Sequence, residues 1–105
     1  MINLRQKELA DWQEKNFGSK TKSSEWQFMG MVEEMGELGH ALLKKKQGIR
    51  NMTHEDVADA FADTIIYGIQ IMTAEGIDAE KAIKDTIDKV LQRDWIKYPS
   101  NGIDK

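Results

Sequence analysis

Residues 53–74, THEDVADAFADTIIYGIQIMTA, decide the fold of this chain because they form a long apolar segment without proline. Thr53, with Asp56 three residues later, predicts a capping box at the start of a helix. Gly76 is well placed to end this helix. The segment therefore predicts a long helix that carries acidic residues among apolar ones.

Two further helices are expected before this segment. Asn3 and Gln6 have capping-box spacing ahead of a first helix that ends near Gly18. A second helix is expected from about Ser24, as its cap, to Lys46, followed by a glycine as a stop. Its apolar residues recur with the spacing of one helical face: Phe28, Met31, Val32, Met35, Leu38 and Leu42.

A fourth helix is expected to begin at Asp78 or a neighbour and to carry an apolar stripe of Ala82, Ile83, Ile87, Val90 and Leu91. The only proline, Pro99, follows all four helices, and no segment alternates convincingly with period two. We therefore expect an all-α fold, an antiparallel four-helix bundle, in a single domain spanning residues 1–105.

The composition restricts the classes of function. The 15 basic and 18 acidic residues are interspersed and give a net charge of −3, which disfavours binding to a nucleic-acid polymer. The absence of cysteine excludes disulfides and thiolate chemistry. The N-terminal segment lacks the apolar core of a signal peptide, and Asp59 and Asp63 interrupt the longest apolar stretch. We therefore expect a soluble cytoplasmic protein with no membrane partner.

Acidic residues occur on two of the predicted helices. Glu34 and Glu37 flank the apolar stripe of the second helix, whereas Glu33 points further away. In the third helix one narrow stripe carries Asp56, Asp59, Asp63, Tyr67 and Gln70. An unpaired buried carboxylate is costly, so positive charge is expected opposite these acids.

Two explanations of this positive charge stay open. Carboxylates that two helices present inward can bind a hard divalent cation, and Mg²⁺ in particular takes one or two carboxylates together with water and substrate phosphates. The alternative is ordinary ion pairing with Lys44, Lys45, Lys46 and Arg50.

The pattern Glu33-Glu34-x-x-Glu37-Leu38, followed by Asp63-Thr-Ile-Ile-Tyr67, resembles the all-α MazG-like nucleotide pyrophosphohydrolases. The resemblance extends over residues 28–98 and includes the segments 43–50, LKKKQGIR, and 92–99, QRDWIKYP. It implies a Mg²⁺-dependent enzyme, with Mn²⁺ as a substitute, that hydrolyses a nucleoside triphosphate to the monophosphate and pyrophosphate.

The resemblance also implies roles for particular residues. Glu34 and Glu37 would bind the metal with Asp63, and Glu33 or Glu37 would take the proton of the attacking water. A further family glutamate falls on Ala60 in this sequence. Asp59, one turn before Asp63 on the same stripe, is the expected replacement, with Asp56 a turn further back as the alternative.

Cationic and aromatic residues supply candidate substrate contacts. Phosphates require cationic donors, and aromatic faces stack on bases. The expected phosphate contacts are Lys44, Lys46, Arg50, Arg93 and Lys97, and the expected stacking residues are Tyr67, Trp95 and Tyr98, with Trp26 as a further aromatic residue.

Two other classes of function compete with this interpretation. Glu37 and His40 form one E-x-x-H motif, but a di-iron carboxylate bundle uses two such motifs, and His54 supplies no second one. A non-enzymatic helical oligomerisation or regulatory module could pair its acidic stripes with a partner's lysines. For the pyrophosphohydrolase interpretation, apolar residues left over on the third helix predict an oligomer, most simply a homodimer, with the nucleotide site near or across the subunit interface. The resemblance to MazG-like enzymes also implies a dimer or a dimer-based tetramer.

Overall fold

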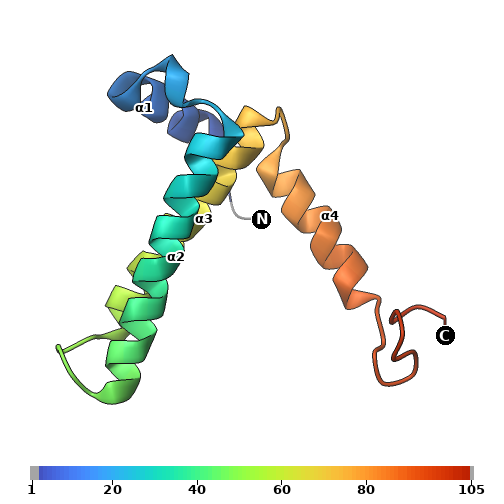
Figure 1. The fold of residues 1–105 in the computed structure, drawn as a ribbon. Coiled ribbons are helices and arrows are strands. Elements are labelled where there is room, and N and C mark those ends of the chain that lie inside the picture. The colour runs from blue at the N-terminus through green and yellow to red at the C-terminus, as the bar shows by residue number, and fades with distance from the viewer. Residues whose placement is uncertain (1–2, 105) are drawn as a thin grey trace.

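The computed structural model describes residues 3–104, and this part of the chain is helical without a strand (Figure 1). Its elements are the α-helices α1 (Gln6–Phe17), α2 (Ser24–Gln47), α3 (His54–Ala74) and α4 (Ala79–Leu91), and the short 3₁₀ helix η1 (Ser19–Thr21). The predicted all-α class is therefore confirmed. None of the described helices is long and apolar enough to cross a membrane.

The helices α2 and α3 form a long antiparallel hairpin (Figure 1). Gly48 ends α2 in the left-handed conformation at φ 73°, which confirms the predicted stop. Gly30 sets the register of the two helices, because a Cβ there would lie 2.2 Å from Cε1 of Tyr67. One residue further along each helix, Met31 packs against Gly68: the Met31 Cε lies 3.5 Å from where a Cβ on Gly68 would be. Gly30 and Gly68 thus allow α2 and α3 to pack closely.

Three of the four expected helix starts carry a side-chain cap, two of them as predicted. Thr53 and Asp56 form the capping box of α3, and Asp78 caps α4. For α2 the cap is Ser23, one residue before the expected Ser24.

The capping box predicted for Asn3 and Gln6 was wrong. The helix α1 begins at Gln6 itself, after Arg5 in the left-handed conformation and without a side-chain cap. Asn3 instead accepts a hydrogen bond from the backbone N–H of Arg5 at 2.9 Å, and Gln6 reaches across to the end of α3.

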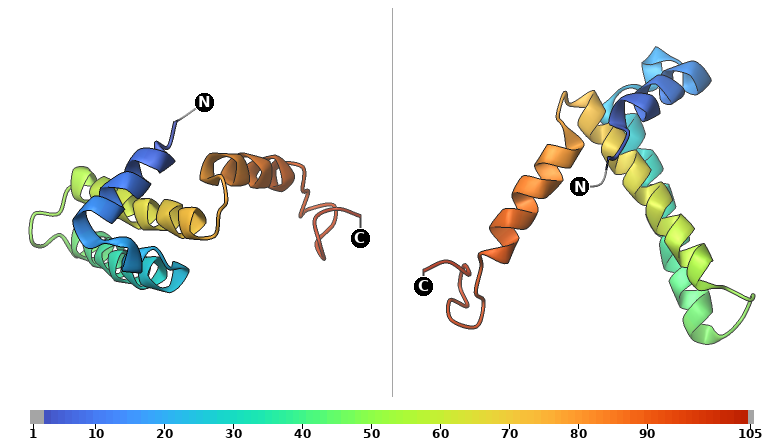
Figure 2. Two further views of the ribbon diagram at one scale, coloured as in Figure 1. Left: turned by 90° about the horizontal axis from the view of Figure 1, so that it is seen from above. Right: turned by 180° about the vertical axis from the view of Figure 1, so that it is seen from behind.

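The N-terminal segment crosses the end of the hairpin opposite the α2–α3 turn. There it lies over the start of α2 and the end of α3 (Figure 2). Gln70 Nε2 donates to the Leu9 carbonyl at 2.7 Å, and buried Gln27 donates to the Thr21 carbonyl at 2.7 Å. Buried side-chain amides therefore fasten α1 and η1 to the hairpin.

The helix α4 stands apart from the hairpin, so that the chain has the outline of an inverted V in views from opposite sides (Figures 1 and 2). Within one chain the four helices consequently do not lie side by side as the bundle expected from the sequence. The helix α4 diverges at the α3–α4 linker, where hydrogen bonds from the N-terminal segment reach Ile77, Ala79 and Glu80.

The core of one chain is small, and its buried apolar residues are Ala41, Ala60, Ile69 and Ala79. Large apolar side chains remain outside, such as Phe61 on α3, which is 54% exposed. The accessible surface is 8143 Å², whereas a compact chain of 12.0 kDa has about 6,000 Å². The radius of gyration is 17.1 Å, against about 13 Å for a compact domain of this length. The fold of one chain thus leaves unusually much apolar surface uncovered.

Candidate functional site

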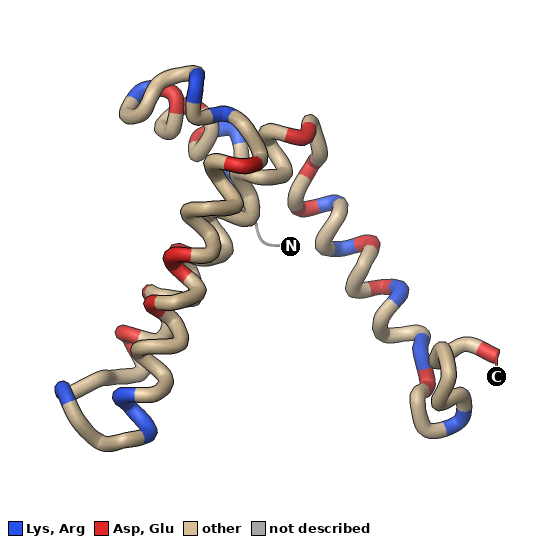
Figure 3. Tube along the Cα trace, in the orientation of Figure 1, with Lys and Arg blue, Asp and Glu red and all other residues tan. Residues whose placement is uncertain are grey.

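Acidic residues gather near the middle of the α2–α3 hairpin (Figure 3). The contact between Gly30 and Tyr67 fixes their arrangement, because Glu34 lies one turn after Gly30 on α2 and Asp63 one turn before Tyr67 on the antiparallel α3. Partial burial raises the pKa of Glu34, and the charge of Asp63 raises it further. The carboxylate of Asp63 on α3 is therefore near enough to that of Glu34 on α2 for their charges to repel.

Glu33 and Glu37 complete this group, since their charges also raise the pKa of Glu34. We call Glu33, Glu34, Glu37, Asp59 and Asp63 the acidic cluster. In the described part of the chain none of the five forms an ion pair with a lysine or arginine. Like charges are thus held together without a compensating cation from the same chain.

The basic residues predicted to neutralise these acids lie further along, where α2 ends and the turn to α3 begins (Figure 3), and they include three of the predicted phosphate contacts: Lys44, Lys46 and Arg50. Lys44 Nζ donates to the Gln47 side chain at 3.1 Å. Lys46 and Arg50 are exposed, and Arg50 has a left-handed backbone at φ 61°. These side chains form a cationic rim at one end of the hairpin.

The structure distinguishes the two aspartates proposed to replace the family glutamate. Asp56 Oδ2 accepts hydrogen bonds from the backbone N–H and hydroxyl of Thr53, at 2.9 and 3.1 Å, and so serves the helix cap. Asp59 is exposed and has no hydrogen-bond or ion-pair partner among the described residues. Ala60, where the family glutamate would fall, is buried. Of the two aspartates, Asp59 thus has the more available carboxylate.

The expectation that the aspartate stripe lies in an apolar interior was wrong for a single chain. Asp56, Asp59 and Asp63 are all exposed, because α3 is covered on one side only. Further along the stripe, half-buried Tyr67 packs over Gly30, and buried Gln70 holds α1. Tyr67 therefore borders the acidic cluster, whereas Gln70 fastens α1 to the hairpin.

The chemistry of the acidic cluster fits a hard divalent cation. Ionised carboxylates are acceptors only, and Mg²⁺ binds oxygen ligands of this kind. In the described residues no three acidic, histidine or cysteine side chains converge closely enough to hold a metal ion. The exposed members, Glu37, Asp59 and Asp63, are free to change rotamer, so coordination would require a local rearrangement of side chains.

The predicted substrate residues near the C-terminus lie in a loop beyond α4 that is held by its own hydrogen bonds. Asp94 Oδ1 accepts from the backbone N–H groups of Ile96 and Lys97 at 3.1 and 2.9 Å, and the Asp94 N–H donates to the Gly102 carbonyl at 2.8 Å. Gly102 has φ 75°, and a Cβ there would approach Arg93 and Trp95 at 3.0 and 3.1 Å. We call residues 93–102 the C-terminal loop.

The C-terminal loop presents cations together with aromatic rings. The Arg93 guanidinium lies 5.8 Å from the centre of the Trp95 ring, and the Lys97 ammonium lies 5.3 Å from that of Tyr98. Cations and aromatic rings are the groups expected to contact phosphate and base, and their role in substrate binding stays a prediction. In one chain, however, the C-terminal loop is on one leg of the V and the acidic cluster on the other (Figures 1 and 3).

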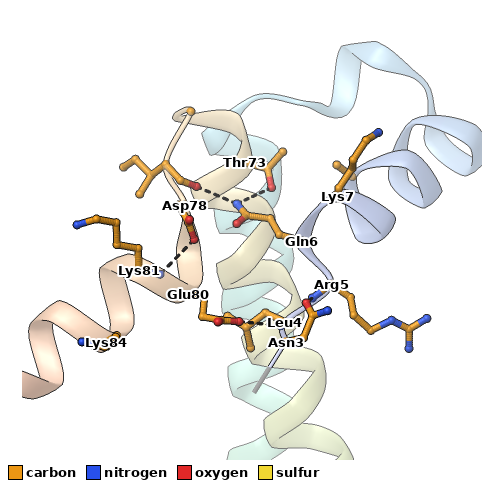
Figure 4. Close-up of a pocket in the computed structure, with 13 residues that line it drawn as sticks. Asn3, Leu4, Arg5, Gln6, Lys7, Thr73, Asp78, Glu80, Lys81 and Lys84 are labelled. Carbon is orange, nitrogen blue, oxygen red and sulfur yellow. Dashed lines mark hydrogen bonds between the residues drawn. The ribbon is translucent and has the colours of Figure 1, made fainter. Parts of the chain in front are cut away.

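A pocket of about 840 Å³ lies elsewhere, where the start of α1 meets the end of α3 and the start of α4 (Figure 4). Lysines and arginine line it together with acidic side chains, namely Arg5, Lys7, Lys81 and Lys84 with Asp78 and Glu80. None of the predicted site residues belongs to this lining. The sequence analysis missed the contacts of Gln6 and Glu80 with distant residues here. No motif or spacing in the sequence indicates a hydrogen bond between residues so far apart.

Compared with family models, curated proteins and solved structures, the chain matches none of them.

Proposed function

We propose that this protein is a Mg²⁺-dependent nucleoside-triphosphate pyrophosphohydrolase of the MazG-like kind. The observation that supports this most is the acidic cluster, in which Glu34 is held opposite Asp63 and beside Glu33 and Glu37 without a cation from the chain. A fold that keeps repelling carboxylates together is suited to bind a divalent cation, which removes the repulsion. The sequence resemblance to MazG-like enzymes supplies the reaction.

In this proposal Glu34, Glu37, Asp59 and Asp63 hold Mg²⁺, with Mn²⁺ as a substitute. The ion would neutralise phosphate oxygens and acidify a water molecule. Glu33, exposed at the edge of the cluster, or Glu37 accepts the proton of this water as its oxygen bonds to the α-phosphorus. The bond from that phosphorus to the bridging oxygen breaks, giving a nucleoside monophosphate and pyrophosphate.

The working unit in this proposal is a homodimer or a dimer-based tetramer that completes the four-helix bundle. One chain exposes about 2,100 Å² more than a compact chain of its mass would. A stable interface of standard size needs about 800 Å² from each partner. Association with a second copy would therefore cover the excess, including apolar residues of α2, α3 and α4.

The test is pyrophosphate release from a panel of normal and modified ribo- and deoxyribonucleoside triphosphates with Mg²⁺. Wild-type protein should release pyrophosphate, and Glu37→Gln and Asp63→Asn should lose at least about 100-fold in turnover, since each removes a ligand charge. Lys20→Gln, on η1 away from the cluster, is the control and should keep full activity. Wild-type rates in both cluster variants would overturn the metal assignment.

The exposed apolar surface also favours a second candidate, a non-enzymatic helical oligomerisation module. The two functions differ in their response to metal. A metal site that exists only in the folded state raises the melting temperature as Mg²⁺ or Mn²⁺ is added, whereas a pairing module has no such site. A melting temperature unchanged by either ion, together with no pyrophosphate release, would favour the module.

A further inference from the structure

The linker between α3 and α4 is fastened by the N-terminal segment (Figure 4). Gln6 Nε2 donates to Thr73 Oγ1 at 3.1 Å and to the Ile77 carbonyl at 2.8 Å. Its Oε1 accepts from the backbone N–H of Ala79 at 2.9 Å. One side chain thus contacts the last turn of α3, the linker and the first residue of α4.

A further hydrogen bond, from Leu4, joins the N-terminal segment to α4. The backbone N–H of Leu4 donates to Glu80 Oε1 at 3.2 Å, in the first turn of α4. Gly76, with φ 72°, is the flexible point of the linker, and the bonds of Leu4 and Gln6 span it. We call these bonds the linker clasp. A swing of α4 towards its own hairpin would have to break them.

The clasp keeps two apolar surfaces of the same chain apart. On α4 the stripe includes Ile87 and Leu91, which are 50% and 77% exposed. On α2 an apolar face includes Phe28, Val32 and Met35, each half or more exposed. The surface in excess of a compact chain, about 2,100 Å², exceeds what each partner contributes to a stable dimer, about 800 Å².

The length of α4 matches the distance of the acidic cluster from the α3–α4 linker. The helix α4 has 13 residues and so extends about 20 Å from the linker. Asp63 precedes the end of α3 by 11 residues, or about 16 Å, and Asp59 by 15, or about 22 Å. Suppose that α4 lies along a hairpin and that its own linker is at the same end as the linker of that hairpin. The C-terminal loop that follows α4 is then level with the acidic cluster.

We propose that α4 is an exchanged arm: the clasp holds it open so that it packs on the α2–α3 hairpin of a second copy, and that copy's arm packs on the first. A twofold axis between the two legs relates the copies. Arg93 and Lys97 then lie beside the acidic cluster of the other chain, where both can contact the phosphates of one nucleotide. This last step rests on the proposed function, whereas the exchange itself does not.

The experiment uses the natural absence of cysteine. A full-length chain carrying both Ala62→Cys, beside Asp63 on α3, and Ile96→Cys, in the C-terminal loop, is treated with a flexible bismaleimide at micromolar concentration. Exchange predicts a covalent dimer on a denaturing gel, well above the background of either single-cysteine chain. An internally cross-linked monomer, or no product above background, would overturn the exchange.

The clasp is tested in the same double-cysteine chain. Gln6→Ala should free the linker and shift product from covalent dimer to internally cross-linked monomer by several-fold. Gln13→Ala is the matched control, because Gln13 is also on α1 but bonds Thr21 in the N-terminal segment. Equal product ratios in the two variants, with helical circular dichroism retained, would refute the clasp. Cross-linking needs no turnover, so these outcomes are separate from any failure of the pyrophosphohydrolase assay.

Discussion

Replacement of Gly30 by alanine tests the register on which the acidic cluster depends. A new Cβ would lie 2.2 Å from Cε1 of Tyr67, far inside van der Waals contact, so the ring has to move. Overpacking of this kind costs about 1–3 kcal/mol, whereas alanine in place of glycine within a helix gains about 1 kcal/mol. We therefore expect Gly30→Ala to lower the free energy of unfolding by up to about 2 kcal/mol, the difference between those two terms.

Gly36→Ala is the control on the same helix. Nothing in the described chain lies within 4 Å of a Cβ at that position, so only the gain of about 1 kcal/mol is expected there. Urea unfolding of both variants at one protein concentration measures the difference, since the stability of an oligomer depends on concentration. If Gly30→Ala is as stable as Gly36→Ala, the close contact of Gly30 with Tyr67 is refuted, and with it the pairing of Glu34 with Asp63.

Three further predictions concern the acidic cluster and α4. Asp59→Asn should reduce Mg²⁺-dependent turnover more than Asp56→Asn, whose carboxylate serves the helix cap; the reverse order at similar stability would identify Asp56 as the ligand. Because burial and neighbouring acids raise the pKa of Glu34 above the usual 4.5 of a glutamate, the folded protein binds this proton more tightly than the unfolded chain. The stability gained from that proton is therefore present below pH 4.5 and lost as pH rises through the raised pKa. Glu34→Gln should accordingly raise the melting temperature in EDTA at pH 7 and abolish the rise caused by Mg²⁺, and a lower melting temperature in EDTA would contradict the repulsion. Ile87→Asp should weaken self-association at least about 30-fold, or about 2 kcal/mol, by light scattering over a dilution series, with Lys89→Asp as the exposed control; equal association of the two variants would show that the α4 stripe is not an interface.

Helix boundaries were accessible from the sequence because they depend on local chemistry. The capping box at Thr53 and the left-handed Gly48 involve residues only a few positions apart, and both were predicted. The same rules failed at Gln6, whose side chain bonds Thr73 and Ile77 instead of its own helix. No periodicity or spacing encodes a contact between residues so far apart in the chain.

In the candidate site, too, the neighbours within one helix were predictable from the sequence, whereas the surroundings set by distant elements were not. Helical spacing placed Glu34 beside Glu37, and the inference that two acidic helices meet is supported by the effect of Asp63 on Glu34. The exposure of Asp59 and Asp63 was not predictable, because it depends on which elements cover α3. A helical wheel assumes neighbours on every apolar face, whereas in this chain α4 is directed away from the hairpin.

The composition of the core indicates where the stability of this protein must come from. The apolar residues buried in one chain are three alanines and Ile69, whose side chains supply little hydrophobic free energy. The larger side chains that supply about 1.5–3 kcal/mol each when buried, such as Phe28, Phe61 and Leu91, lie outside. In the dimer that we propose, a second copy would bury these outer faces and supply the hydrophobic free energy that the core of one chain lacks.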